Sequence, residues 1–329
     1  KINKYLIYLF LFLFFNCIFI SSLKAADTTN GVKLDNDDLT DDFTGRLLRS
    51  ITFNNDGTKM FVSGILNDRI VQYDLSTGYD LSTISEGDQL TGAKIANPYS
   101  LRFNNDGTKM FFIVGVSSTI REFSLGTAFD ITTASFTVDA SLSDGTSSGF
   151  AFNQDGTKLF AVDNGDTKQV DEYSLSTGFD ITTISYETSL DITDNTSTPR
   201  SIALSPDGTT MFILDGNNQI DEYVLTTGYD VTTAKYVDTF DFTNTTSPWA
   251  ITFNNIGTKL YIAENKDGGV NEYSLGAAYN LTTPTLSSSV PADNATGVLI
   301  DANVVLNFSE PMDVESGNIK IYKTSDNTL

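Results

Sequence analysis

The sequence contains no histidine and only one cysteine, Cys17, among its 329 residues. Without histidine, the Ser-His and Cys-His nucleophile pairs, histidine general bases and histidine-containing zinc or copper sites are excluded. A single cysteine excludes disulfides within the chain and thiolate metal clusters. The chemistry of this chain therefore has to come from carboxylates, hydroxyls, guanidinium groups and aromatic rings.

Basic residues are also scarce: 20 lysines and arginines stand against 42 aspartates and glutamates, and the formal net charge is -22. Phosphate backbones and anionic lipid surfaces repel a molecule of this charge. Nucleic acid and acidic membranes are therefore excluded as the main partners. The length and the 40% content of hydrophobic residues indicate a folded chain, with more than one domain as the first expectation.

Residues 1–25 have the pattern of an export signal. Two lysines precede an apolar run over residues 5–20 that only Asn16 interrupts, and small residues then lead to Ala25. A membrane-spanning helix needs about 20 apolar residues, and this run is shorter. We therefore predict cleavage after Ala25 and a secreted or cell-surface protein. Because the first residue is not methionine, we expect the natural chain to begin earlier.

One unit recurs five times with a period close to fifty residues. Its first block is an apolar segment, a polar turn and a second apolar segment; residues 51–62 read Ile-Thr-Phe-Asn-Asn-Asp-Gly-Thr-Lys-Met-Phe-Val. The glycines of the five turns are Gly57, Gly107, Gly156, Gly208 and Gly257. The second block carries aromatic residues at intervals of fifty, namely Tyr73, Phe123, Tyr173, Tyr223 and Tyr273. A second aromatic follows each of these by six residues: Tyr79, Phe129, Phe179, Tyr229 and Tyr279.

Alternating apolar and polar residues, punctuated by Gly, Asn, Asp and Ser, indicate strands rather than helices. The Asp-Gly of each turn is typical of a hairpin. We interpret it as structural and not as a calcium loop, which would need further oxygen ligands and a distal glutamate. Each unit has room for four strands, and four-stranded units at this period are typical of a β-propeller. We therefore predict an all-β, five-bladed propeller over residues 31–284, with the aromatic residues filling the wedges between blades.

The fifth unit has no outer strand of its own, because the sequence changes character after residue 284. Residues 32–39 belong to no preceding unit and lie about as far before the first turn as the outer strands of the other units do. We therefore expect residues 32–39 to pair with the last blade, which closes the ring and removes an exposed strand edge. The protein is expected to be a monomer.

Two resemblances to known families follow from these residues. The Asp-Gly-Thr-Lys-Met-Phe-Val style of unit resembles the bacterial YVTN and WD40-like propeller repeats; this implies the fold and says little about activity, because such repeats occur in binding scaffolds and in enzymes. Residues 285–329 resemble the opening of an SbsA-type bacterial Ig-like domain, by the segments Pro-Ala-Asp-Asn-Ala, Phe-Ser-Glu-Pro and Gly-Asn-Ile. A complete Ig-like sandwich takes about 100 residues, so we expect the domain to continue beyond residue 329. The resemblance implies a spacer or adhesion element.

The more variable loops should gather on one face of the ring, and variable loops on a rigid scaffold usually carry function. One residue of each unit, four positions before the end of the inner apolar segment, should lie at that face. Together these five residues should surround the mouth of the central channel. The five copies have Arg49, Tyr99, Ser148, Arg200 and Trp249 there. Converging guanidinium and aromatic groups could hold a carboxylate, a sulfate or a sugar. Alternatively, these residues only cover the blade junctions.

An enzymatic role meets an obstacle in the inner segments. Propeller glycosidases need two carboxylates that face the scissile bond, and no inner segment, such as residues 50–53, contains an acid. A calcium-dependent lactonase could instead use acids of the variable loops, because Ca²⁺ accepts an all-oxygen shell. These acids are Asp163, Asp166, Asp215, Glu264 and Asp267. Alternatively, they only keep an exported protein soluble.

We therefore predict an exported binding or adhesion scaffold without catalysis, either secreted or at the cell surface. Its partner would be a surface ligand, either a glycan or a protein. No cofactor is expected for this function. The alternative is a lactonase-type propeller hydrolase, which would require calcium.

Overall fold

The structure is a computed structural model. It describes residues 26–33, 47–64, 68–115, 117–142, 146–242, 247–265, 269–275, 277–281, 286–290 and 305–308. The predicted export signal, residues 1–25, lies outside this part of the chain. One compact unit spans Thr28–Tyr279, and a second includes Asn280–Leu329. No helix within the described ranges has the length and apolar character to cross a bilayer.

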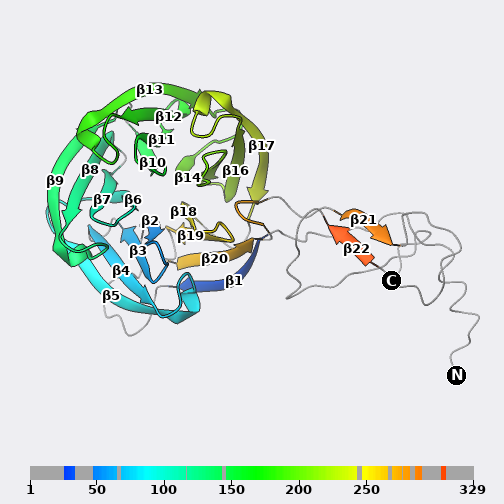
Figure 1. The fold of residues 1–329 in the computed structure, drawn as a ribbon, viewed down its shortest axis with the longest axis horizontal. Coiled ribbons are helices and arrows are strands. Elements are labelled where there is room, and N and C mark those ends of the chain that lie inside the picture. Colours follow the sequence, from blue (N-terminus) through cyan, green and yellow to red (C-terminus); the bar gives the residue numbers. More distant parts are fainter. Residues whose placement is uncertain are drawn as a thin grey trace, which may run out of the picture. The chain divides into compact units, whose positions relative to one another are not determined.

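Five four-stranded sheets form a ring, with one edge strand of each sheet, its inner strand, nearest the centre (Figure 1). The five-bladed propeller that the repeats predict is therefore confirmed. Blades 1 and 2 are β2 (Leu48–Phe53), β3 (Lys59–Gly64), β4 (Arg69–Leu75) and β5 (Ile84–Thr91), then β6 (Pro98–Phe103), β7 (Lys109–Val114), β8 (Thr119–Leu125) and β9 (Ala134–Ser141). Blades 3 and 4 are β10 (Ser147–Phe152), β11 (Lys158–Asn164), β12 (Lys168–Leu175) and β13 (Ile184–Asp191), then β14 (Pro199–Leu204), β15 (Thr210–Asp215), β16 (Gln219–Leu225) and β17 (Ala234–Asp241).

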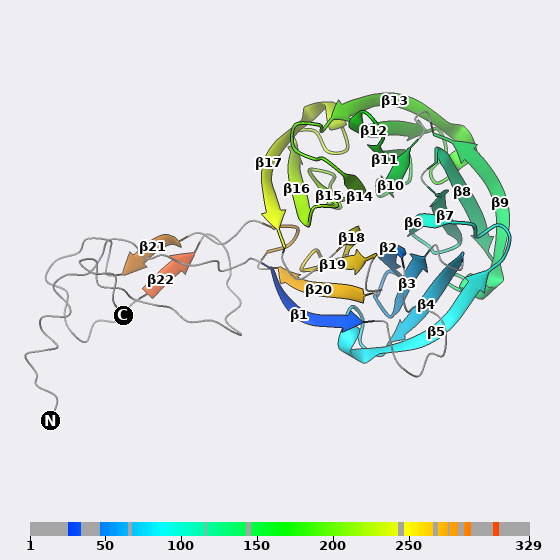
Figure 2. The same cartoon turned by 180° about the vertical axis from the view of Figure 1, so that it is seen from behind.

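Blade 5 takes three strands from the end of the ring and one from its beginning. They are β18 (Pro248–Phe253), β19 (Lys259–Glu264), β20 (Gly269–Leu275) and β1 (Ala26–Lys33). Both views place β1 beside β20, on the outside of the blade (Figures 1 and 2). Closure by an N-terminal strand is thus confirmed, but its predicted bounds, residues 32–39, were wrong.

The outer strands explain this error in the bounds. In blades 1 to 4 they are mostly exposed or half-buried, as in β5, so they need few apolar residues. A polar segment such as Ala-Asp-Thr-Thr-Asn-Gly-Val-Lys can therefore serve as one, although it carries almost none of the alternation that identifies a strand in a sequence. The predicted segment and β1 share only Val32 and Lys33.

The described part of the C-terminal unit is a pair of strands. β21 (Leu286–Val290) pairs antiparallel with β22 (Val305–Phe308), and Leu286 lies opposite Phe308. Other segments that suggested an Ig-like domain, including Gly-Asn-Ile at residues 317–319, lie outside the described residues.

The two recurring turns of each blade lie together on one face. In blade 1, the main-chain N–H of Tyr79 donates to the carbonyl of Gly57 at 3.0 Å. Gly57 has φ +71°, and a Cβ atom there would lie 2.3 Å from the Tyr79 ring. Only glycine therefore allows the ring to cover the turn. Tyr79 itself has φ 61°, and the equivalent aromatic residue of every blade shares this conformation.

Among the described residues, a short 3-10 helix follows the recurring aromatic of blades 1 to 4: η1 (Leu81–Thr83), η2 (Ile131–Thr133), η3 (Ile181–Thr183) and η4 (Val231–Thr233).

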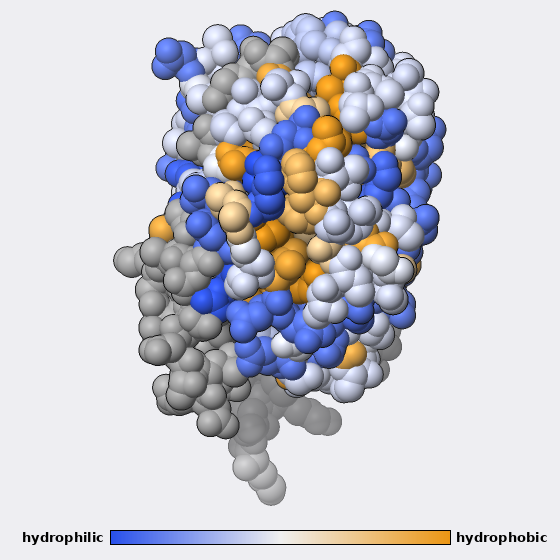
Figure 3. Space-filling model, turned by 90° about the vertical axis from the view of Figure 1, so that its left-hand side faces the viewer, coloured by the Kyte–Doolittle hydropathy of each residue, from blue (hydrophilic) through white to orange (hydrophobic). Residues whose placement is uncertain are grey.

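Apolar side chains fill the wedges between neighbouring blades. The Phe53 ring of blade 1 lies 4.6 Å from that of Tyr261 in blade 5, and Phe61 of blade 1 lies 4.7 Å from Phe103 of blade 2. Tyr73, from the fifty-residue series, is buried in the cluster that joins blades 1 and 5. On the rim, outer strands expose some aromatic rings, such as Tyr186, and hydrophobic residues are visible among hydrophilic ones in side view (Figure 3).

A lysine crosses four of the five junctions between blades. In blade 3, Lys158 Nζ lies 2.5 Å from a carboxylate oxygen of Glu172 and donates to the carbonyl of Tyr229 in blade 4 at 2.6 Å. Lys109, Lys259 and Lys59 make the equivalent bond to the next blade, at 2.7, 2.9 and 3.3 Å. These bonds tie the second strand of one blade to the recurring aromatic of its neighbour.

Blade 4 departs from this arrangement. Thr210 stands where the other blades have lysine, while Glu222 occupies the register of Glu172: it lies opposite Phe212, as Glu172 lies opposite Phe160. Burial, together with the nearby charge of Asp238, raises the pKa of Glu222 to about 7. No lysine or arginine of the described residues forms an ion pair with it.

Replacing Glu222 by glutamine should stabilise the protein in a pH-dependent way. The pKa of Glu222 is about 7 in the folded chain against an ordinary 4.5, so the folded state binds more protons between these values and loses stability as pH rises through them. The melting temperature of E222Q should therefore match wild type near pH 5 and exceed it at pH 8. In E172Q, the matched control, the pair with Lys158 is lost and the melting temperature at pH 8 should fall. Equal curves for E222Q and wild type at pH 8 would contradict this.

Removing β1 should destabilise the ring, because β20 then loses its outer neighbour and exposes an edge. We compare a protein of residues 26–329 with one of residues 34–329 by thermal unfolding. A loss of about 3 kcal/mol would lower the melting temperature by roughly 6–12 °C in a domain of this size. Coinciding melting curves would show that β1 does not close the ring.

Candidate functional site

Each inner strand is irregular at the end that faces the variable loops. In β2, Leu48 pairs with Gly64 and Ser50 with Ser63, so Arg49 has no partner in the ladder. The same extra residue occurs in β10, β14 and β18, where it is Ser148, Arg200 and Trp249. Such a bulge bends the strand and re-aims a side chain. Four of the five positions singled out from the sequence are therefore bulge residues.

Four of the five predicted side chains meet at this end of the inner strands. The guanidinium carbon of Arg49 lies 3.5 Å from the centre of the Trp249 ring, and that of Arg200 lies 3.7 Å from it. Two guanidinium groups cannot share one face of the indole at these distances, so the ring lies between them. The Tyr99 ring lies 5.8 Å from Trp249, edge to face, and 5.1 Å from the Arg49 carbon. We call Arg49, Tyr99, Arg200 and Trp249 the axial cluster.

The contacts place the axial cluster over the middle of the ring. Tyr99 belongs to blade 2 and Trp249 to blade 5, and blade 1 with its Arg49 lies between them. Side chains of blades that are not neighbours can touch only where the inner strands converge. The predicted convergence of these four side chains near the axis of the ring is therefore present, while a ligand at this place stays a prediction.

The polar atoms of the axial cluster are buried and short of acceptors. Arg49, Tyr99 and Trp249 are 7, 6 and 7% exposed. Within the described structure, no hydrogen bond is made by Nε and Nη1 of Arg49, Nε of Arg200 or Nε1 of Trp249. Unpaired donors in a buried site are unfavourable, so these four N–H groups are ready to bind an acceptor.

The charge of the cluster is poorly balanced. Burial lowers the pKa of Arg49 to about 10; Tyr99 opposes this decrease and Arg200 adds to it, and the group is still protonated at neutral pH. Burial also lowers the pKa of Arg200, which Asp215 partly opposes. Among the described carboxylates, Asp215 acts on Arg200 and none acts on Arg49, so the cluster keeps a positive charge in an otherwise acidic protein.

A third arginine lies deeper in the ring and was missed as a site residue. Arg102 of β6 donates from Nη1 to the carbonyl of Leu101 at 2.8 Å and from Nη2 to that of Ile202 in blade 4 at 3.2 Å. Blade 3 separates these two blades, so the guanidinium joins inner strands that are not neighbours in the ring. Burial lowers its pKa to about 10. The only signal in the sequence was a charged residue in the inner segment Ser-Leu-Arg-Phe, where the other four copies have Thr or Ala.

Ser148, the fifth predicted position, has a structural role. Its hydroxyl donates to the carbonyl of Pro199 in blade 4 at 2.9 Å. Other serines of the inner strands also join neighbouring blades: the Ser50 hydroxyl accepts from the N–H of Leu101 at 2.6 Å, and that of Ser100 accepts from Phe150 at 2.9 Å. The interpretation as a junction cover therefore fits Ser148.

The acids of the calcium alternative are not brought together among the described residues, where no three acids form a metal-binding group. Asp163 accepts from Thr146 and from the N–H of Gly165, and Glu264 accepts from the amide of Asn271, so each is engaged in its own blade. Asp166 is exposed. Asp267 lies outside the described residues.

Of the described acids of the calcium alternative, Asp215 accepts the most hydrogen bonds. Its carboxylate accepts from the Thr198 hydroxyl at 2.6 Å and from the N–H groups of Ser197 and Asn217 at 2.6 and 2.9 Å. Burial acts to raise the pKa of Asp215, but these hydrogen bonds hold it below its ordinary value. The carboxylate orders the loop that leads to Arg200, which is a structural use of the group.

Comparison with protein families matches residues 280–328 to a family described as bacterial Ig-like domain. The C-terminal residues therefore carry a bacterial Ig-like domain, as predicted. The narrower SbsA type stays a prediction, and so does the relation of the ring to YVTN and WD40-like repeats. Comparison with curated proteins gives no match.

Among solved structures, a putative 6-phosphogluconolactonase of Bacteroides fragilis is 16% identical, with a TM-score of 0.42 over 59% of this chain and 53% of that chain. A protein of Lactobacillus plantarum is 18% identical, with a TM-score of 0.40 over 59 and 55%. A periplasmic gluconolactonase of Pseudomonas aeruginosa is 16% identical, with a TM-score of 0.39 over 62 and 56%. The chain thus spans little more than half the length of these structures, and likeness at this level carries no argument about activity.

Calcium should leave the stability of the protein unchanged, because the described candidate ligands are engaged in their own loops. We compare thermal unfolding in calcium chloride, in magnesium chloride and in a chelator at equal ionic strength, and expect one melting temperature. A calcium-specific increase that saturates at one ion per chain would contradict this and favour the lactonase alternative, because a ligand that binds the folded state raises its stability.

Proposed function

We propose that this protein is an exported, non-catalytic binding protein whose axial cluster holds an anionic group of its ligand, a carboxylate or a sulfate. The observation that carries the proposal is the set of four buried donors on Arg49, Arg200 and Trp249 without partners. Guanidinium and indole nitrogens only donate, so the missing partner has to be an acceptor. Arginine binds carboxylate and sulfate oxygens through two parallel hydrogen bonds, which neutral groups do not match in strength.

The surroundings of the Trp249 indole favour a ligand that is bound through its charge, and they disfavour a sugar ring that would stack on the indole. Guanidinium groups cover both faces of Trp249, at 3.5 and 3.7 Å. A sugar ring therefore has no free face of this residue to stack on. Each guanidinium group is also attracted to the indole ring, and this contact fixes both side chains. The donors are therefore ordered before a ligand arrives.

The acidic surface limits the kind of anion that can bind. The net charge of -22 repels polyanions at a distance, and this repulsion is screened by salt. A ligand with one or few charges, such as the acidic sugar of a glycan, fits the cluster better than a nucleic acid does. The bacterial Ig-like domain over residues 280–328 supports a role as an adhesion scaffold, by its resemblance to the spacers of surface proteins.

The lactonase-type alternative has less support among the described residues. Hydrolysis of this kind would need a metal or a pair of carboxylates near the reacting bond. The acids near the axial cluster, such as Asp215, are occupied by their own loops, and the inner strands contain none. We therefore propose binding without catalysis.

Replacing Arg49 by methionine should separate binding from stability. Titration calorimetry with sulfate and with glucuronate should show binding to the wild-type protein and at least a tenfold weaker response in R49M, since hydrogen bonds to charged groups contribute about 1.5–3 kcal/mol. The unliganded R49M protein should melt no lower than wild type, because methionine removes a buried charge without a partner and keeps the bulk of the side chain.

Arg121 supplies the matched control. It is also buried, at 9% exposure, but it pairs with both oxygens of Asp139 at 2.7 and 2.8 Å. R121M should therefore melt lower than wild type and bind both anions as wild type does. If wild type binds neither anion, or if R49M binds them unchanged, the axial cluster is not the binding site.

A further inference from the structure

The junction between blades 4 and 5 lacks the cation that every other junction has. At the other four, Nζ of a lysine donates to the carbonyl of the recurring aromatic in the next blade; Lys158 donates to Tyr229 in this way. At the fourth junction the lysine is replaced by Thr210, and the corresponding aromatic is Tyr279.

A second link between the blades is lost at the same place. At three other junctions asparagines join the turns of neighbouring blades: Asn55 Nδ2 donates to the carbonyl of Asn105 at 2.7 Å, Asn255 donates to that of Asn55 at 3.2 Å, and Asn105 makes the same bond to blade 3. Blade 4 has Pro206 at this position, which offers no side-chain donor. Both substitutions remove atoms that fill the space between turns elsewhere in the ring.

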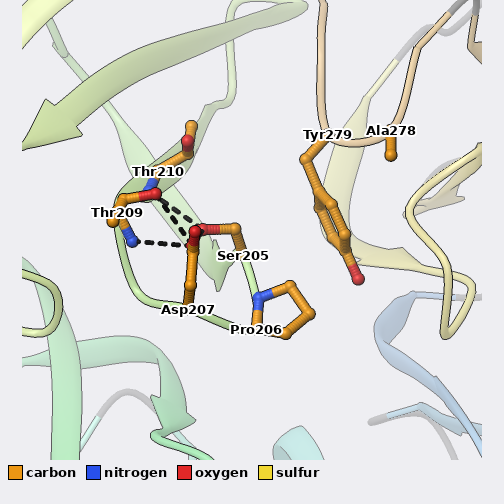
Figure 4. Close-up of a pocket in the computed structure, with 7 residues that line it drawn as sticks. All are labelled: Ser205, Pro206, Asp207, Thr209, Thr210, Ala278 and Tyr279. Carbon is orange, nitrogen blue, oxygen red and sulfur yellow. Dashed lines mark hydrogen bonds between the residues drawn. The ribbon is translucent and has the colours of Figure 1, made fainter.

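A pocket of about 310 Å³ lies at this junction (Figure 4). One wall is the turn of blade 4 and the other is the segment that follows β20 of blade 5; the lining residues are Ser205, Pro206, Asp207, Thr209, Thr210, Ala278 and Tyr279. The side chains of Thr210 and Tyr279 lie on opposite walls, with the ring of Tyr279 facing the pocket (Figure 4). The pocket therefore occupies the space that a lysine at position 210 would cross.

The two acceptors that bind the lysine in other blades remain at this junction: Tyr279 lines the pocket, and Glu222, which is not a lining residue, lies on the same face of blade 4 as Thr210. Thr210 and Phe212 lie two residues apart on β15 and share a face, and Glu222 lies opposite Phe212 on the same face. The Phe212 ring lies 4.9 Å from that of Phe253 in blade 5, so this face is turned toward the junction. Glu222 is half-buried and has no basic partner among the described residues. The Tyr279 ring, which packs 5.2 Å from Phe253, adds an aromatic face.

We propose that this pocket binds a primary alkylammonium group, which takes the place of the missing lysine Nζ between Tyr279 and Glu222. The ammonium of a bound ligand would donate to the Tyr279 carbonyl and pair with the carboxylate, as Lys158 does with Tyr229 and Glu172. An ammonium near the face of an aromatic ring is further stabilised by the ring electrons. The volume of about 310 Å³ accommodates an alkyl chain as well as its charged end.

Two sources could supply this group: a free amine, such as a polyamine, and a lysine side chain of a partner protein. The first probe is n-butylammonium, with the uncharged n-butanol as its control. The second pair is spermidine and Nα-acetyl-lysine methylamide, which separates the free amine from the lysine side chain within a peptide. Binding is followed by titration calorimetry with the complete chain.

The wild-type protein should bind n-butylammonium and show at least tenfold weaker binding of n-butanol. Thr210→Lys places an internal ammonium in the pocket, so this variant should melt higher than wild type and lose the amine response. Val237→Lys adds the same charge on β17, where the side chain is 47% exposed, and should keep the response. Tighter binding of spermidine than of acetyl-lysine methylamide identifies a free amine as the ligand class, and the reverse order identifies a lysine of a partner.

Glu222→Gln supplies a variant that does not depend on filling the pocket. It should weaken binding of n-butylammonium at pH 8 at least tenfold while the protein melts no lower than wild type. The proposal is overturned if wild type binds no amine, if n-butanol binds equally well, or if T210K keeps the amine response. None of these results bears on anion binding at the axial cluster, because no residue of that cluster lines this pocket.

Discussion

Contact between the faces of neighbouring sheets is the interaction on which the rest of this structure depends. Each wedge is filled by rings such as those of Phe61 and Phe103, which lie 4.7 Å apart, and apolar burial of this kind is the main favourable contribution to folding. A sheet that packs on both sides needs the same bulky residues in every copy. This requirement explains why aromatic residues recur at intervals of fifty while the loops between them differ.

The ring geometry creates both candidate sites, in opposite ways. At one end, bulges in the inner strands direct Arg49, Arg200 and Trp249 toward the axis, where four blades bring together side chains that no single blade could assemble. At the junction of blades 4 and 5, a site results from an interrupted repeat, because Thr210 and Pro206 replace residues that elsewhere join the blades. Departure from the repeat is therefore as informative as the repeat itself.

The sequence predicted the blades, their number and the meeting of the axial residues, because period and alternation are local properties of a chain. The closing strand was misplaced, since a polar outer strand such as Ala26–Lys33 carries little pattern. The bulges could not be predicted, because one extra residue in a strand leaves no mark until its partner strand is known. Arg102 was missed because its role depends on reaching blade 4, which is not a neighbour of its own blade.

The central functional claim is that the axial cluster receives an anion. A crystal of the protein soaked in selenate, which resembles sulfate and scatters X-rays anomalously, tests this directly. The account predicts an anomalous peak within hydrogen-bond distance of the Arg49 guanidinium and Trp249 Nε1, and its absence in crystals of R49M. Peaks confined to exposed lysines, or none at the axis, would contradict it.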